Sequence, residues 1–443
     1  MDSMAAEPDT LCQIPVGLER GELVDRLAAE FPAAAALPGG RGSAVEMPWR
    51  GGRERALARL ATLDPAAYAR TRNHVDGSVS RLSPWIRHGV LSLAEVRDAA
   101  VRQAGAAAEK FVSELGWRDY WRRVQAAVGA GIAAAIEPPA AEPRAAPVPA
   151  VPADVLAAAT GMACIDAFVR RLHDTGWLHN HERMWLASWL VHVRGVEWRA
   201  GADWFLSHLV DGDPASNHLS WQWVAGTFSA KPYLFNRENL ETFTAGVHCR
   251  TCPVFGVCDV EGSYDELAAR LFVGGSGPRS GPTPKVRPAG RWRPGGEPPP
   301  LERPLVWLAL DSASASAAAA VAHPTAPRLF VIDPGWLAEE RPALKRLVFL
   351  WECLADAPGV EIHVGDPRAI LPRRARALGC DGIAVTETPC PRIRAAAAEV
   401  ARTLPVAVHE WPAFCDASRV NELGRFSRYW QKVSRSALEP TPA

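Results

Sequence analysis

A short segment near the middle of the chain concentrates residue types that suit a heterocyclic ligand. Residues 211–223 read DGDPASNHLSWQW, which places two carboxylates, the amide of Asn217 and two tryptophans in one stretch. Asp211 and Asp213 can accept hydrogen bonds from a heterocycle, and the amide of Asn217 can face its reactive edge. The two tryptophans can stack on a base or pass electrons. The alternative interpretation is a capped helix start with buried aromatic side chains.

Three cysteines with the spacing of metal ligands follow this segment. The stretch HCRTCPVFGVCD arranges Cys249, Cys252 and Cys258 as C-x2-C-x5-C. Thiolates in such a tight loop indicate zinc or an iron–sulfur cluster, and either one normally takes a fourth ligand. His248 is one candidate for that ligand. Free thiols are the alternative to a metal site.

The composition describes a large globular chain. Its 443 residues suffice for two or three domains, and 48% of them are hydrophobic. The net charge of zero does not indicate a nucleic-acid-binding protein, although residues 47–125 are rich in arginine. No apolar run approaches the roughly 20 residues of a membrane span, and we expect no secretory signal. Nine cysteines, an odd number, favour a reducing compartment. We therefore expect the cytoplasm.

The elements that position these residues change character along the chain. Residues 1–45 form an Ala/Gly-rich extension, and the apolar period over 46–273 is helical. A Gly/Pro-rich linker occupies 274–303. Over 304–415, short β-branched runs alternate with helical segments, which predicts a parallel α/β sheet of about five strands. Residues 416–443 form a connector-like tail.

Several motifs in a fixed order resemble the DNA photolyase/cryptochrome family. They cover most of residues 45–245 and read SRLSP, FVSELGWRDYW, TGMACIDAFVRRLHDTGWLHNHERM and DGDPASNHLSWQW. The resemblance implies an α-helical FAD-binding domain followed by a Rossmann-like α/β domain of the family's antenna type. The family usually has these domains in the opposite order, so the chain resembles a circular permutation. GRFSRYWQKV (424–433) is similar to the segment that usually joins the two domains. The alternative is an unrelated α/β domain.

The resemblance also assigns residues to FAD. Arg183 would pair with Asp211 beside the isoalloxazine, where the pair can stabilise a reduced, anionic flavin. Asp213 would receive hydrogen bonds from the polar edge of the ring, and Asn217 would face N5. The motif at Ser80 resembles a phosphate loop at a helix start. The other implied flavin contacts, including those of that loop, are Tyr68, Ser80, Arg81, Leu82, Ser83, Phe111, Arg118, Trp177 and Asn180.

A second set of positions resembles the family's substrate cavity and electron route. The cavity would hold a pyrimidine dimer flipped out of DNA, with apolar walls and hydrogen bonds to the pyrimidine edge. Trp221 and Trp198 match the first two tryptophans of the photoreduction chain, while the third is not placed. The positions that resemble the catalytic set are Glu114, Trp117, Asn180, Met184, Asn217 and Trp223.

The resemblance extends to a metal centre. A bacterial branch of the family holds a [4Fe–4S] cluster with one cysteine on a helix and the others in a later loop. Cys164 stands where the ordinary motif has an aliphatic residue, so the implied ligands are Cys164, Cys249, Cys252 and Cys258. Zinc and free thiols remain alternatives.

The implied activity is blue-light-driven repair of UV-induced pyrimidine dimers by electron transfer from reduced FAD. We expect the cyclobutane lesion, damaged DNA as partner, no membrane, and a monomer. His179 and His181 leave a (6-4) lesion open, because enzymes for that lesion use paired histidines near this position. A cryptochrome-like blue-light photoreceptor without repair activity, and a flavoprotein with a partner other than DNA, also remain open. The antenna chromophore stays unknown.

Overall fold

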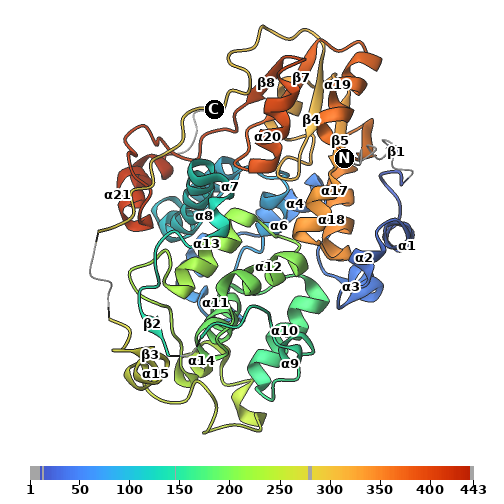
Figure 1. Cartoon of the computed structure of the whole chain (residues 1–443). Helices are drawn as coiled ribbons and strands as arrows, with labels where there is room; N and C mark the ends of the chain where they lie inside the picture. Colours follow the sequence, from blue (N-terminus) through green and yellow to red (C-terminus); the bar gives the residue numbers. More distant parts are fainter. Residues whose placement is uncertain (1–9, 12–13, 145, 278–281, 440–443) are drawn as a thin grey trace, which may run out of the picture. The chain divides into compact units, whose positions relative to one another are not determined.

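The structure, a computed structural model, describes residues 10–11, 14–144, 146–277 and 282–439 (Figure 1). Parts of the predicted extension, linker and tail lie outside the described residues, namely 1–9, 12–13, 278–281 and 440–443. The chain forms two compact units, each assembled from separate segments. The α/β unit comprises Met1–Thr62, Arg81–Asp98 and Ala289–Cys415, and the helical unit comprises Leu63–Ser80, Ala99–Pro288 and Asp416–Ala443. The continuous domain boundaries expected from the sequence stay a prediction.

The α/β unit contains a six-stranded sheet in the order β1-β6-β5-β4-β7-β8. Strands β4 to β8 are parallel, and β1 joins the edge antiparallel to β6. All residues of β4 and β7 are buried, as expected for central parallel strands covered on both faces. This confirms the predicted parallel sheet. The bounds are β1 (Thr10–Leu11), β4 (Pro304–Leu308), β5 (Arg328–Ile332), β6 (Val360–Val364), β7 (Gly382–Thr386) and β8 (Val406–His409).

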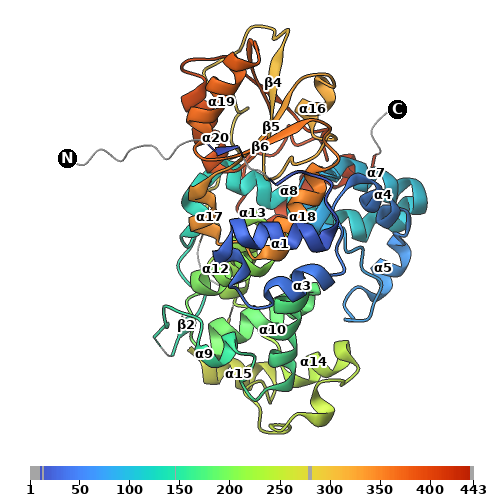
Figure 2. The same cartoon turned by 90° about the vertical axis from the view of Figure 1, so that its right-hand side faces the viewer.

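Helices cover the two faces of this sheet. Figure 2 shows α19 and α20 on one side of the strands and α16 on the other. Two of the connecting helices begin with an Asp-Pro pair, in which Asp333 and Asp366 cap the first turns and proline takes the next position. The helices after β4 are α16 (Ala318–Ala322), α17 (Pro334–Glu340), α18 (Leu344–Leu354), α19 (Pro367–Ala377) and α20 (Pro391–Val400).

The N-terminal part of the chain packs into the α/β unit. The guanidinium of Arg20 donates to the Glu352 carboxylate of α18 at 2.8 and 2.7 Å and to the Met47 carbonyl at 2.9 Å. A buried arginine with these partners ties the segment to a distant helix. The helices are α1 (Arg20–Glu30), α2 (Pro32–Ala35), α3 (Gly40–Glu46), α4 (Arg53–Ala61), α6 (Ser83–Arg87) and α7 (Leu93–Ala104), the last of which crosses into the helical unit.

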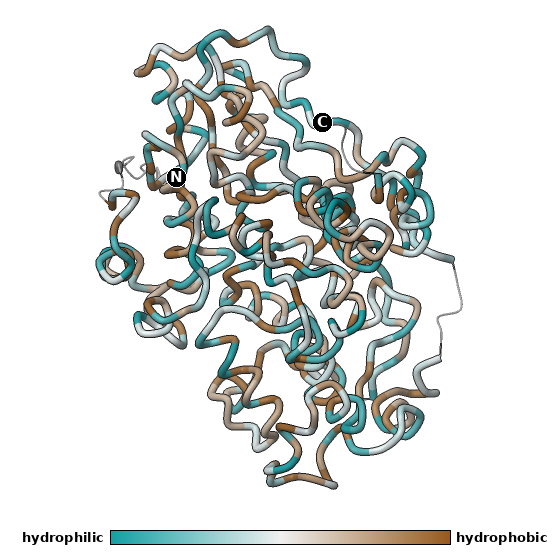
Figure 3. The backbone as a smooth tube through the Cα atoms, turned by 180° about the vertical axis from the view of Figure 1, so that it is seen from behind, coloured by the Kyte–Doolittle hydropathy of each residue, from teal (hydrophilic) through white to brown (hydrophobic). Residues whose placement is uncertain are grey.

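The helical unit surrounds a core rich in aromatic residues. Trp185, Trp189 and Phe168 are fully buried there, and Figure 3 shows apolar and polar residues interleaved along the helices. Figure 1 shows α8, α12 and α13 side by side. The helices are α5 (Pro65–Thr71), α8 (Glu109–Val128), α9 (Ala153–Leu156), α10 (Ala163–Thr175), α11 (Asn180–Ser188), α12 (Trp198–His208), α13 (Pro214–Ala225), α14 (Arg237–Thr244), α15 (Tyr264–Leu271) and α21 (Phe426–Ala437).

Two further features complete the helical unit. Strands β2 (Glu142–Pro143) and β3 (Phe272–Val273) form a small antiparallel pair. Within the described parts of the chain, no helix combines the length and the apolar character that a membrane crossing requires.

Candidate functional site

The start of α13 carries the acidic segment singled out in the sequence. Asp213 is the N-cap of this helix, and its carboxylate accepts hydrogen bonds from the backbone N–H and the hydroxyl of Ser216. Pro214 at the next position suits a first helical turn. Asp211 is 3% exposed and Asp213 is 4% exposed. Two carboxylates buried this deeply need cationic or hydrogen-bonding partners.

Two arginines from other helices supply those partners. Arg183 of α11 donates through Nη2 to the two Asp211 carboxylate oxygens at 3.1 and 2.8 Å. Arg118 of α8 lies with Nη1 3.3 Å from an Asp213 oxygen. Burial lowers the pKa of the Arg118 guanidinium, while the charges of Asp213 and Asp211 act in the opposite direction. Three helices therefore bring two carboxylates and two guanidiniums into one buried cluster, which we call the carboxylate–arginine cluster.

Asn217 lies one turn along α13 from Asp213. Its side chain is 8% exposed, and its Nδ2 donates to the Ala202 carbonyl of α12 at 2.7 Å. This bond fixes the amide plane and directs Oδ1 away from the Ala202 carbonyl. Asn217 can thus present an acceptor to a donor on a ligand.

The loop before α11 and its first turn hold several predicted residues. His179 caps the helix and forms a capping box with Glu182. Asn180 is exposed and its Nδ2 lies 3.3 Å from the Met184 sulfur. The Arg183 guanidinium also lies 6.0 Å from the centre of the Trp177 ring. The structure therefore gathers Trp177, Asn180, Arg183 and Met184 at one helix start.

His181, on the same turn, is held from two sides. Its Nδ1 lies 2.6 Å from the Asn73 carbonyl, and its ring stacks on Trp185 at 5.2 Å. Burial lowers the pKa of His181, and the nearby charge of Arg72 acts in the same direction, while the Asn73 carbonyl opposes the shift. His181 is thus a half-buried imidazole whose orientation is fixed.

Helix α8 carries the next group of predicted residues. Tyr68 of α5 meets Phe111 edge to face at 5.1 Å, and burial raises the pKa of the Tyr68 hydroxyl. The Glu114 carboxylate lies 2.6 Å from Lys110 Nζ and 3.6 Å from Arg72 Nε. These two cations were not predicted as site residues, although Lys110 lies at the i–4 position that an acid–base pair on a helix uses.

Three predicted tryptophans belong to α12 and α13. Trp221 is buried and meets Phe205 edge to face at 4.9 Å. Trp198 lies edge-on to His218 at 6.3 Å, and Trp223 contacts Tyr233 at 5.6 Å. All three rings pack in or against the core of the helical unit, so they also serve its stability.

The predicted phosphate loop is divided between the two units. Ser80 ends a segment of the helical unit, while Arg81, Leu82 and Ser83 begin a segment of the α/β unit. Arg81 has a φ of 54°, a left-handed value that is uncommon outside glycine and recurs at ligand sites. The role of these four residues toward FAD stays a prediction.

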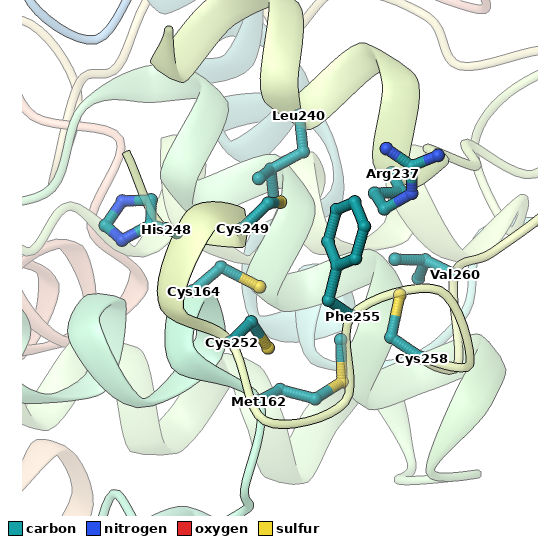
Figure 4. A pocket seen from close by; sticks show the side chains of 10 residues that line it. All are labelled: Met162, Cys164, Arg237, Leu240, His248, Cys249, Cys252, Phe255, Cys258 and Val260. Carbon is teal, nitrogen blue, oxygen red and sulfur yellow. The ribbon is translucent and has the colours of Figure 1, made fainter. Parts of the chain in front are cut away.

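The four predicted cysteine ligands line one pocket of the helical unit. Cys164 is the second residue of α10, and the other three lie in the loop that follows α14. In Figure 4 the Cys164 and Cys252 thiols point into the same space, and Cys258 lies across the Phe255 side chain from them. Burial raises the pKa of Cys164 to about 12 and of Cys249 to about 11.

The thiols are not arranged around one point. Among the described residues, no group of three or more His, Cys, Asp or Glu lies close enough together to hold a single metal ion. The pocket is otherwise lined mainly by apolar and aromatic side chains, among them Met162, Leu240, Phe255 and Val260. The pocket therefore holds its cysteines in a largely apolar environment.

Residues 111–245 match a family model described as the FAD binding domain of DNA photolyase. The matched segment contains the whole carboxylate–arginine cluster and Asn217. The class of this part of the chain is therefore a flavin-binding helical domain. In this segment the chain is similar to the photolyase/cryptochrome family.

Individual relatives agree with this family. The chain is 40% identical over 154 residues to a deoxyribodipyrimidine photo-lyase of Streptomyces griseus. The matched stretch covers 34% of this chain and 32% of the relative. It is 35% identical over 232 residues to a deoxyribodipyrimidine photo-lyase of Thermus thermophilus, covering 46% and 52%. It is also 34% identical over 166 residues to a cryptochrome DASH of Oryza sativa subsp. japonica, covering 36% and 28%. The chain thus spans from about a third to about half the length of these relatives.

Proposed function

We propose that the protein is a light-driven DNA photolyase that repairs UV-induced pyrimidine dimers, with the cyclobutane type as its substrate. One observation carries the proposal: the buried pairs Arg183–Asp211 and Arg118–Asp213 lie within the segment that matches the FAD binding domain of DNA photolyase. The relatives from Streptomyces griseus and Thermus thermophilus, both named deoxyribodipyrimidine photo-lyase, support the same activity.

The carboxylate–arginine cluster fits a flavin ring. The Arg183 guanidinium beside the ring would favour an anionic, reduced ring over a neutral one, and Asp211 would hold that guanidinium in place. Asp213 would accept hydrogen bonds from the N–H groups of the ring's polar edge. Asn217 Oδ1 would accept from N5–H, which only the reduced ring carries, because Nδ2 is already engaged by the Ala202 carbonyl. When bound and reduced, FAD supplies a light-excited electron to the lesion.

The residues around the substrate would bind and orient the dimer. The Glu114 carboxylate accepts a hydrogen bond from the pyrimidine edge, and Lys110 and Arg72 hold that carboxylate in place. Trp117, Met184 and Trp223 supply apolar walls for the saturated ring of a dimer. Asn180, exposed at the start of α11, donates or accepts at the rim.

We propose a [4Fe–4S] cluster as the occupant of the cysteine pocket. A zinc ion needs all four sulfurs about 2.3 Å from one atom. In a [4Fe–4S] cluster each thiolate binds a different iron, so the sulfurs surround a larger body. The four cysteines line one pocket, and the resemblance to the cluster-bearing branch of the family favours the cluster over zinc. Iron and acid-labile sulfide near four of each per chain support this proposal, and stoichiometric zinc without sulfide contradicts it.

The permuted architecture is also a proposal. It is supported by the order of the motifs within residues 304–415 and by the packing of α21 on α8 of the helical unit. We retain the boundaries 1–45, 46–273, 274–303, 304–415 and 416–443 as the proposed domains. A monomer acting on damaged DNA in the cytoplasm completes the proposal.

A cryptochrome-like photoreceptor is the second candidate, favoured by the match to a cryptochrome DASH. A (6-4) photolyase is the third, favoured by the fixed and half-buried His181. The experiment compares oligonucleotides with a cyclobutane dimer or a (6-4) lesion, incubated with the reduced protein under blue light. Repair of the cyclobutane dimer alone supports the proposal. Repair of the (6-4) lesion alone, or of neither lesion by a protein whose flavin photoreduces, contradicts it.

A further inference from the structure

The C-terminal helix places an aromatic ring directly on a predicted cavity residue. The Phe426 ring of α21 stacks on the Trp117 ring of α8, with centroids 3.8 Å apart and planes 15° from parallel. The Trp430 ring follows Phe426, with its centroid 5.9 Å from the Phe426 centroid and its plane 17° from parallel. Three nearly parallel rings therefore run from α8 into α21, two helices of the helical unit whose packing Figure 1 shows.

Specific polar contacts fix α21 and the loop before it on α8. The Tyr120 hydroxyl donates to the Leu423 carbonyl at 2.7 Å, and the Tyr429 hydroxyl donates to the Asp119 carboxylate. Arg425 donates to the two oxygens of Glu137 at 2.8 and 3.0 Å. Because these groups are buried or half-buried, their loss would leave unsatisfied polar atoms, which defines one docking position for the helix.

The backbone of α8 is shaped for this docking as well. A Cβ added at Gly116 would lie 2.5 Å from the Trp430 ring. A larger residue at this position would therefore have to displace the Trp430 ring. The residue before Trp117 thus belongs to the same interface as the ring stack.

We infer that Phe426 is a positioning residue for the lesion cavity, and that the C-terminal helix is a working part of the proposed active site. The inference rests on the proposed function of Trp117 as a cavity wall. A free tryptophan ring samples several rotamers, and ordering it on substrate binding costs free energy. Phe426 covers one face of the Trp117 ring and leaves it oriented before the lesion arrives.

The rings differ from the core aromatics around them. Tyr120 and Tyr429 are fully buried, whereas Trp117 and Phe426 are only half-buried. If Phe426 only covered the half-exposed edge of the core, it would need apolar volume but no parallel stack on Trp117. A stack at this place is consistent with an oriented surface, and this distinction can be tested by a residue that keeps volume without a ring.

The test compares Phe426→Leu, Phe426→Tyr and, as a control on the same helix, the exposed Ser427→Ala. Binding of a thymine-dimer duplex is measured in the dark with the FAD-loaded protein. We expect Phe426→Leu to weaken binding about threefold to tenfold, the range of an aromatic stack. Phe426→Tyr and Ser427→Ala should bind within about twofold of the wild type. Equal binding by all three variants overturns the inference.

A double-mutant cycle shows whether Phe426 acts through Trp117. In a Trp117→Leu background, Phe426→Leu should have at most about half of its effect, since the coupling belongs to the pair. An undiminished effect overturns the inference and assigns Phe426 to helix docking alone.

A spectroscopic measurement separates this inference from the proposed function. The near-ultraviolet circular dichroism of Trp117 is the difference between wild type and Trp117→Phe, and it should shrink in Phe426→Leu. If the wild type shows no preference for damaged duplex, the proposed function fails, while this signal still decides whether Phe426 orients Trp117. An unchanged signal overturns the positioning role.

Discussion

The Arg183→Met variant tests the carboxylate–arginine cluster, because it keeps the length of the side chain and removes its charge. Asp211 would remain buried and would lose a donor at 3.1 and 2.8 Å. Removing one partner of a fully buried pair costs about 3–5 kcal/mol. The Arg183 side chain is 25% exposed, so water partly screens the pair. We therefore expect a loss of about 2–3 kcal/mol in the free energy of unfolding.

The assay is urea unfolding of the flavin-free protein at neutral pH, followed by far-ultraviolet circular dichroism. Arg199→Met is the matched control, because its partner Asp203 lies in the same unit and the two side chains are 39% and 34% exposed. A pair this accessible is worth less than about 1 kcal/mol. Arg183→Met should also lose most of its bound FAD, while Arg199→Met should keep it. Equal stability losses in the two variants, or full FAD content in Arg183→Met, would contradict the proposed role of the Arg183–Asp211 pair.

Three other substitutions test separate parts of the account. Asn217→Ala removes the acceptor expected at N5–H, so air oxidation of the reduced flavin, followed by absorbance, should accelerate about twofold to tenfold; an unchanged rate contradicts that role. Gly201→Ala places a Cβ 2.3 Å from the Trp221 ring, and such overpacking should cost about 1–3 kcal/mol in thermal unfolding; an unaltered melting temperature argues against this packing. Cys258→Ser should lower iron per chain while Cys380→Ser leaves it unchanged, and equal iron contents speak against the cluster.

Local sequence patterns were sufficient to predict the strands of the sheet and the site residues that share one helix. Alternating β-branched runs and helical segments predict the parallel strands β4 to β8, because buried parallel strands are uniformly apolar. The spacing of Asp211, Asp213 and Asn217 similarly follows from one capped helix start. Edge strand β1, only two residues long, carries too little pattern to be predicted.

Contacts between segments far apart in the chain could not be predicted from the sequence. Arg20 lies in an Ala/Gly-rich stretch that carries little information, yet it pairs with Glu352, which is 332 residues away. The docking of Tyr429 on Asp119 spans 310 residues. Periodicity indicates which face of a helix is apolar, but it does not say which partner covers that face. For the same reason the stack of Phe426 on Trp117 and the discontinuous units were not foreseen.

Light-dependent restoration of thymine is the most direct test of the central claim. The anaerobically reduced, FAD-loaded protein is given a cyclobutane thymine-dimer oligonucleotide, and restored thymine is counted per bound FAD under blue light and in the dark. We expect many turnovers in the light and none in the dark, because the electron returns after each repair. No restoration in the light by a protein that retains reduced FAD would contradict it.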